Sequence, residues 1–228
     1  ALAYVATDEE FALCRPFAEI APPRPQLPPP EGKGVRLFAD EAVVQQEQAI
    51  STFQGNVLLQ RGEQILKAPL LVYDYNQDTA NTNKEFTFWD PKFIISGTHL
   101  KALPDNQGEM RDATYWLLTK RARGHSDKII KESEEVMTLE GASYTTCDPR
   151  KEIWRLDARS ITLDHAEETG TAHHVILNIL DVPVFYTPYL SFPLGKGRES
   201  GFLAPNVGSS DETGLEFSLP YYLNLAPH

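Results

Sequence analysis

The residues best suited to metal or acid–base chemistry gather between positions 164 and 174. His165, His173 and His174 lie there with the carboxylates of Asp164 and Glu167. Imidazole and carboxylate groups are common ligands of zinc. In a strand, however, adjacent side chains point to opposite faces, so His173 and His174 cannot both reach one metal ion unless the strand bulges. We therefore expect no metal site.

Motifs of other catalytic classes do not occur. The sequence holds no GxSxG, no HExxH, no Gly-rich phosphate loop and no Cys/His nucleophile pair. Paired carboxylates are frequent, but with 32 acidic and 21 basic residues, net charge -11, they arise by chance and belong on a solvated face. We expect no enzymatic activity and no cofactor. Because no Lys/Arg block could follow a nucleic-acid backbone, we also expect no nucleic-acid partner.

The two cysteines, Cys14 and Cys147, stand far apart in the chain. Their spacing fits neither a zinc-ligand pattern nor a CxxC redox motif. Composition alone leaves open two buried thiols or a disulfide. Cys147 lies in SYTTCDP, among turn residues, which favours disulfide use in an oxidising compartment.

The elements that would position these residues are mostly strands. A proline-rich tract at 16–30 predicts an extended, semi-rigid spacer that would let Cys14 reach a partner far from the folded body. After it, short segments rich in β-branched and aromatic residues alternate with turn residues. The predicted strands are 53–60, 65–75, 85–90, 92–97, 113–118, 152–158, 160–165 and 174–180. The best helical candidate, 126–141, is interpreted as two short strands around a polar turn. No apolar run suits a transmembrane helix, and the first residues lack the pattern of a signal peptide.

A weak repeat underlies the strands. A small residue opens a segment leading to an apolar strand at intervals of 27 to 34 residues, at Ala39, Ala68, Gly97, Gly124 and Ala158. This spacing predicts one hairpin per unit, each covering its neighbour's apolar face. We favour an antiparallel jelly-roll over a parallel β-helix, which has a stricter and shorter coil.

Alternation predicts which side chains face the interior. In WRLDARSITLD, Trp154, Leu156, Ile161 and Leu163 share one side, and Ser160 and Thr162 take the other. In HVILNIL, both faces are mostly apolar, so this strand is covered on both sides or lies beside another apolar body. The interior could be a closed core, which is the commoner case, or an open site for a ligand.

The segments GNVLLQRGEQILKAPLLVYD, YTTCDP with WRLDARSITLD, and VPVFYTPYLSFP carry a resemblance to a known family. In order and content they closely resemble the periplasmic region of the LptD family, the outer-membrane lipopolysaccharide-assembly proteins. The resemblance implies an all-β fold: an open β-jelly-roll of stacked antiparallel hairpins, leading into the first strands of a transmembrane β-barrel. It further implies three regions: an N-terminal segment and linker (1–34), a periplasmic jelly-roll (35–182), and a hinge with the first barrel strands (183–228).

The same resemblance implies a transport function at the cell outer membrane. The jelly-roll would receive lipopolysaccharide, shield its acyl chains in an apolar groove facing the periplasm, and pass it to the barrel. About 0.8 kcal/mol per buried CH2 would drive this without a basic surface. The predicted groove lining is Trp154, Leu156, Ile161, Leu163, Val175, Leu177 and Ile179.

Cysteines and prolines acquire roles by this resemblance alone. Cys14 and Cys147 would each bond to a C-terminal cysteine that this sequence lacks, so no bond between the two is expected. Prolines in VPVFYTPYLSFP would interrupt the strand ladder between jelly-roll and barrel, and those of the first barrel strands would weaken a lateral gate. The hinge and gate prolines are Pro183, Pro188, Pro193, Pro205 and Pro220.

The implied partners are lipopolysaccharide and two proteins. An LptA-type bridge would add a strand to the first exposed edge, within Val35 to Gln60, and the lipoprotein LptE would bind the full-length protein. Two alternatives remain open: a structural module that docks the bridge without binding lipid, and a polysaccharide-modifying β-helix, which would need a carboxylate cluster on a concave face.

Overall fold

The computed structural model describes residues 21–28, 34–119, 122–150 and 152–194, and the backbone of four short strands between 201 and 222. Within these residues the only helical element is the 3-10 turn η1 (Gln46–Gln48), which confirms the all-β prediction. No helix in the described ranges has the length and apolar character needed to cross a membrane.

The strands of the main sheet are β1 (Val35–Phe38), β2 (Glu41–Gln45), β3 (Ile50–Arg61), β4 (Gln64–Asp74), β5 (Thr79–Thr82), β6 (Phe86–Trp89), β7 (Phe93–Gly97), β8 (His99–Ala102), β9 (Gly108–Leu117), β10 (Ala122–Lys131), β11 (Val136–Tyr144), β12 (Trp154–Asp164), β13 (Thr169–Ile179) and β14 (Val182–Pro193). The four short strands are β15 (Gly201–Phe202), β16 (Asn206–Ser210), β17 (Gly214–Ser218) and β18 (Tyr221–Tyr222).

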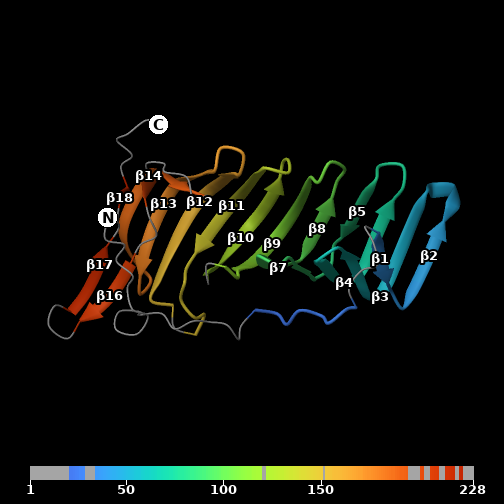
Figure 1. Cartoon of the computed structure of the whole chain (residues 1–228), viewed down its shortest axis with the longest axis horizontal. Helices are drawn as coiled ribbons and strands as arrows, with labels where there is room; N and C mark the ends of the chain where they lie inside the picture. Colours follow the sequence, from blue (N-terminus) through green and yellow to red (C-terminus); the bar gives the residue numbers. More distant parts are fainter. Residues whose placement is uncertain are drawn as a thin grey trace.

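The main sheet joins 14 strands, ordered along its length from β1 and β2 to β14 (Figure 1). Every pair of neighbours is antiparallel, from β1 with β3 through β13 with β14. The fold is therefore the predicted jelly-roll of antiparallel hairpins, and a parallel β-helix is excluded. Region 126–141 forms the end of β10, a turn and the start of β11, as predicted. The two strands predicted at 152–158 and 160–165 are one strand, β12.

Each long strand bends near its middle. Non-glycine residues adopt a left-handed backbone at Asn56 in β3, Asp112 in β9 and His174 in β13, and Gly141 does so in β11. The pairing skips a position at each of these points and at the residues opposite them. Between β4 and β9 the bend becomes a break, which separates β5 from β6 and β7 from β8. One line of bends therefore crosses the whole sheet.

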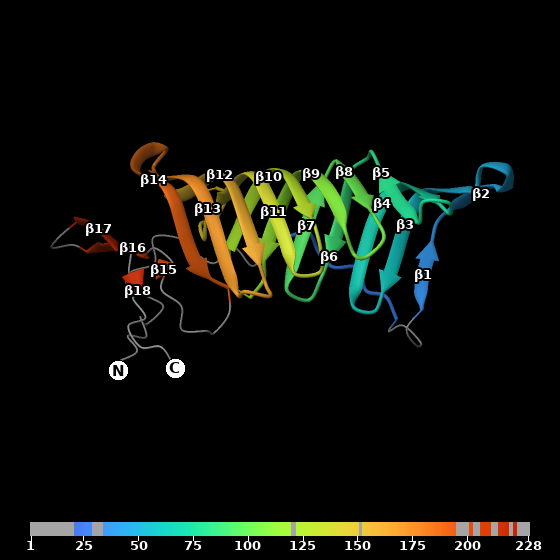
Figure 2. The same cartoon turned by 90° about the horizontal axis from the view of Figure 1, so that it is seen from above.

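The bends divide the sheet into two halves that face each other, visible as two layers of strands in Figure 2. Half-sheet A comprises β1, 57–61, 64–68, β6, β7, 113–117, 122–126, 142–144, 154–158, 175–179 and 182–187. Half-sheet B comprises β2, 50–54, 70–74, β5, β8, 108–111, 128–131, 136–140, 160–164, 169–173 and 189–193.

Small residues line the inner side of the bends. The buried row contains Val57, Ala68, Ala113, Ser126, Ala142, Ala158 and Val175, and its members are cross-strand neighbours in several steps, such as Ser126 with Ala142 and Ala142 with Ala158. Larger side chains would collide where the two halves converge. Ala68 and Ala158 of the predicted repeat belong to this row, whereas Ala39, Gly97 and Gly124 do not, so the row explains two of the five repeat positions.

The proline-rich segment 21–28 packs on the sheet and is not a free spacer along this stretch. It crosses the outer face of half-sheet A, where it runs below the sheet in Figure 1. The indole N–H of Trp89 donates to the carbonyl of Pro22 at 3.0 Å, and the amide of Gln60 donates to Pro28 at 3.4 Å. Leu27 packs against an outer apolar cluster that includes Trp89 and Trp116. This contact corrects the expectation of a spacer held away from the body, because the outer face of half-sheet A is apolar here and needs a cover.

VPVFYTPYLSFP forms β14, the last strand of the main sheet. It pairs with β13 from Val182 to Pro193, with one irregularity beside Leu177 and Asn178. The sheet thus continues past residue 182, where we expected the jelly-roll to end. Pro188 lies at the bend, opposite His174, and β13 is the only strand of the main sheet that pairs with β14. The pairing with β13 skips Pro188 and shifts by one position between Phe185 and Pro183, whereas Pro193 pairs with Thr169. The role of these prolines as a hinge to a barrel stays a prediction.

Candidate functional site

The interior between the two half-sheets is mostly apolar. Its largest buried cluster draws on strands from β3 to β11, with Leu71, Phe86, Tyr115 and Leu139 among its members. Side chains near the line of bends are fully buried. Because both half-sheets contribute, this cluster joins them into one body.

Burial decreases from the bends toward the free rims of the two half-sheets. Half-buried apolar side chains pack against the cluster from both sides. On half-sheet A these include Leu59, Phe88 and Leu117, and on half-sheet B Met110, Met137 and Leu163. The interior therefore presents apolar surface to solvent from Leu59 to Leu117 along the rim of half-sheet A and as far as Leu163 along the rim of half-sheet B, and is not a fully closed core.

All seven predicted lining residues lie on this inner surface. Trp154, Val175 and Leu177 are buried, while Leu156, Ile161, Leu163 and Ile179 are half-buried. Trp154 and Leu177 share a cluster with Cys147, and Ile161 contacts the cluster of Ala158 and Val175. Leu156 and Ile161 share a face despite their odd spacing because the bend at Arg159 lies between them.

Several inner residues escaped the sequence analysis. They are Leu59, Phe88, Met110, Leu117 and Met137. Alternation within 53–60, 85–90 and 113–118 would have indicated three of them, since Leu59, Phe88 and Leu117 share a face with Val57, Phe86 and Ala113. The two methionines lie in strands that we predicted only in part.

The Cys147 loop (residues 145–150, 152 and 153) covers the rim of half-sheet A between β11 and β12. Cys147 is fully buried and disulfide-bonded. Cys14 lies outside the described residues. The disulfide in this structure cannot be the implied pairing, because the C-terminal cysteines are not in the sequence, and that pairing stays a prediction for a longer chain.

An ion-pair network holds this loop to the sheet. Arg123 donates to the carbonyl of Cys147 at 2.9 Å and to the carboxylate of Glu152. Glu152 also accepts from Arg155 at 2.7 Å, and Arg155 pairs with Asp157 at 2.9 Å. The hydrogen bond to Asp157 raises the pKa of Arg155, so Arg155 keeps its charge at any physiological pH.

Asp148, in the same loop, predicts an acid-sensitive contribution to stability. Its carboxylate accepts from the Arg150 side chain at 2.8 and 3.0 Å and from the Arg150 backbone N–H. These bonds lower its pKa from 3.8 to about 2. A carboxylate whose pKa is lower in the folded than in the unfolded protein stabilises the fold at pH values above its unfolded pKa. The contribution of Asp148 is therefore lost as the pH falls from about 4 to 2. Urea unfolding across this range should show a shallower pH dependence in Asp148→Asn; identical slopes would contradict the assignment.

The histidines form no metal site in the part of the chain that the structure describes, where no group of three or more ligating side chains occurs. His173 meets the ring of Tyr189 edge-on, while His174 Nδ1 is hydrogen-bonded to the hydroxyl of Tyr186 at 2.8 Å. The backbone N–H of His165 donates to Glu135 in the neighbouring turn. Each histidine therefore has a separate structural contact.

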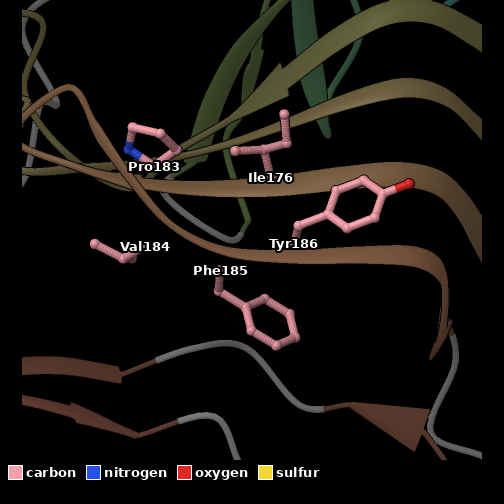
Figure 3. Close-up of a pocket in the computed structure, with 5 residues that line it drawn as sticks. All are labelled: Ile176, Pro183, Val184, Phe185 and Tyr186. Carbon is pink, nitrogen blue, oxygen red and sulfur yellow. The ribbon is translucent and has the colours of Figure 1, made fainter.

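The outer face of β13 and β14 carries exposed apolar side chains. A shallow pocket of about 300 Å³ is lined by Ile176, Pro183, Val184, Phe185 and Tyr186 (Figure 3). Ile176 and Tyr186 are cross-strand neighbours and lie on one side of β14, with Phe185 on the other. The prediction that HVILNIL has apolar groups on both faces is confirmed at Ile176 and Leu177. Pro205 and Pro220 lie outside the described residues, so the gate role stays a prediction.

The opposite end of the sheet also has free strand edges. β1 and β2 pair only with β3, on half-sheets A and B respectively. All five residues of β2 are exposed, with Val44 at 60%. The exposed edge expected within Val35 to Gln60 is thus present.

The chain matches the family model described as "LptA/(LptD N-terminal domain) LPS transport protein" over residues 37–169. The chain belongs to this family. The LPS-assembly protein LptD of Nitrosococcus oceani is 35% identical over 96% of this chain and 30% of its own length. That of Chromohalobacter salexigens is 37% identical over 76% of the chain and 21% of its own length. The chain thus spans about a third or less of these relatives.

The chain is also similar to one solved structure. The crystal structure of LptH, the LptA homologous periplasmic component of the lipopolysaccharide transport device from Pseudomonas aeruginosa, covers 64% of this chain and 82% of its own. Its sequence identity is 15% and its TM-score 0.26. The names of the family members describe transport and assembly.

Proposed function

We propose that this chain is the periplasmic part of an outer-membrane lipopolysaccharide-assembly protein and holds the acyl chains of lipopolysaccharide between its half-sheets. The observation that carries the proposal is the apolar interior whose side chains are half-exposed along both rims. Acyl chains gain about 0.8 kcal/mol per buried CH2 in such a groove. The sugar and phosphate groups stay in water at the rims, so the acidic surface of the chain is no obstacle.

The two ends of the sheet suit entry and exit. An LptA-type bridge would add a strand to the free edge of β1 or β2, because an unpaired edge offers a row of backbone donors and acceptors. Lipopolysaccharide would leave past β14 toward the barrel of the longer protein, where LptE would also bind. No chemical step is required along this route. The Cys14 and Cys147 pairings would fix the domain against that barrel.

Photo-crosslinking tests the proposal. A photoreactive residue at Ile161 or Leu163 should form adducts with purified lipopolysaccharide, because both side chains are half-buried on the inner surface. The matched controls are Ser160 and Thr162, their neighbours on the outer face of the same strand, where Thr162 meets Thr138 at 3.4 Å. Adducts at the inner pair alone support a lipid-holding interior.

The alternative function is a docking module that carries no lipid. The free edges of β1 and β2 favour it as much as they favour transport. It predicts no adduct at Ile161 or Leu163 in a folded protein that still binds the bridge. That result would overturn the transport proposal and leave the docking role.

A further inference from the structure

The hairpin between β13 and β14 ends in an unusual turn. Leu180 and Asp181 both have a left-handed backbone, with φ of 49° and 61°. Two-residue turns of this kind favour Asn, Asp and Gly, because a bulky side chain is strained there. Leu180 is also 67% exposed, the highest value among the exposed large hydrophobic residues of the described part. An apolar side chain is thus held in water, in a conformation that disfavours it.

Leu180 lies next to exposed apolar side chains of β14. We call this surface the tip patch: Leu180, Val182, Val184, Phe185 and Tyr186, all between 41% and 67% exposed. Phe185 and Tyr186 point to opposite sides of β14 (Figure 3). A folded protein partner would cover one side of a strand, whereas a fluid apolar medium covers both sides and the tip together.

The chemistry of the tip patch matches the interface of a lipid bilayer. Aliphatic side chains lie at the tip, and Tyr186 places its polar hydroxyl farther from it, as interfacial aromatic residues do. Asp181 lies in the same turn, and the nearby Arg155 is already paired with Asp157 and Glu152. Arg155 also pairs with Asp181 at 3.7 Å, so among the described residues around this turn no uncompensated cation would select anionic lipids.

We propose that the tip patch inserts into the surface of a zwitterionic lipid bilayer and anchors the β14 end of the groove there. This inference rests on the proposed function, because that function supplies the lipopolysaccharide that would arrive at the β14 end. Insertion would bring the β14 rim of half-sheet A, where Leu180 and Val182 lie, to the membrane at the end of the apolar interior. The strained turn has a role in this arrangement, since it presents Leu180 to the bilayer.

The test is flotation of the 228-residue chain with phosphatidylcholine vesicles. Leu180→Asn should reduce the bound fraction about tenfold, the effect of losing one buried leucine. Asparagine suits a left-handed backbone, so the thermal midpoint of the variant should be unchanged or higher. A structural role for Leu180 would instead lower that midpoint. Val44→Asn is the matched control, since Val44 is 60% exposed at the opposite end of the sheet; its binding should equal that of the wild type.

Three results would overturn the proposal: no vesicle binding by the wild type, undiminished binding by Leu180→Asn, or an equal loss in Val44→Asn. A change in self-association alone would identify a second copy as the partner and also overturn it. Lipopolysaccharide adducts at Leu163 without vesicle binding would contradict membrane insertion of the tip patch but not the proposed transport function. Vesicle binding without those adducts would contradict only the proposed transport function.

Discussion

Leu163→Asp should reduce lipopolysaccharide cross-linking from a photoreactive residue at Ile161 by at least about tenfold. Leu163 lies on the rim of half-sheet B, half-buried against the main cluster. An aspartate there would have to lose its hydration when acyl chains cover it, and burial of an unpaired charge costs several kcal/mol. The lipid would therefore leave this part of the groove. Adduct yield at Ile161 measures the effect.

The control for this experiment is Thr162→Asp, one position away on the outer face of β12. It adds the same charge to the same strand without entering the groove, so the adduct yield should stay near that of the wild type. Far-UV circular dichroism and thermal unfolding are used to check that both variants are folded. Equal yields in the two variants would mean that Ile161 does not face bound lipid.

The strand content and the inner face of the sheet follow from local sequence rules. Alternation in β12 predicted Ile161 and Leu163 as inner and Thr162 as outer residues, because successive side chains of a strand point to opposite faces. Clusters of turn residues separated the strands correctly around β6 and β7. The free edge at β1 and β2 was also anticipated within Val35 to Gln60.

Features that depend on distant contacts could not be predicted. The proline-rich segment looked like a spacer because its partners, Trp89 and Trp116, lie more than 60 residues away in the sequence. The prolines of β14 suggested an interrupted ladder, and the pairing does skip Pro188 and shift beside Pro183, but the sequence did not show that this strand would still join the main sheet. Alternation also gives no sign of which turn will carry an exposed leucine.

The line of bends links the fold to the proposed function. A flat antiparallel sheet of this width would have two separate faces, whereas the bends turn one face inward along its whole length. Gly141 is one point where the bend requires a particular residue. Its φ is +56°, and a Cβ there would lie 2.0 Å from the carboxylate of Asp127. The sequence signal for the bends is the row of small residues beside them, such as Ala142 and Ala158.

Gly124→Ala should destabilise the fold by about 3 kcal/mol, the upper end of the usual cost of overpacking. Gly124 pairs with Tyr115 in half-sheet A, and a Cβ would lie 1.9 Å from the Ser143 carbonyl and 2.5 Å from the tyrosine ring. That carbonyl accepts the Tyr115 hydroxyl at 2.5 Å, and burial raises the pKa of Tyr115, so the hydroxyl stays a donor. The extra methyl group would separate β10 from β11. The free energy of unfolding in urea measures the loss of stability. Gly34→Ala is the control, because a Cβ at Gly34 meets nothing within 4 Å. A Gly124→Ala protein as stable as that control would contradict the close packing on which the bent sheet depends.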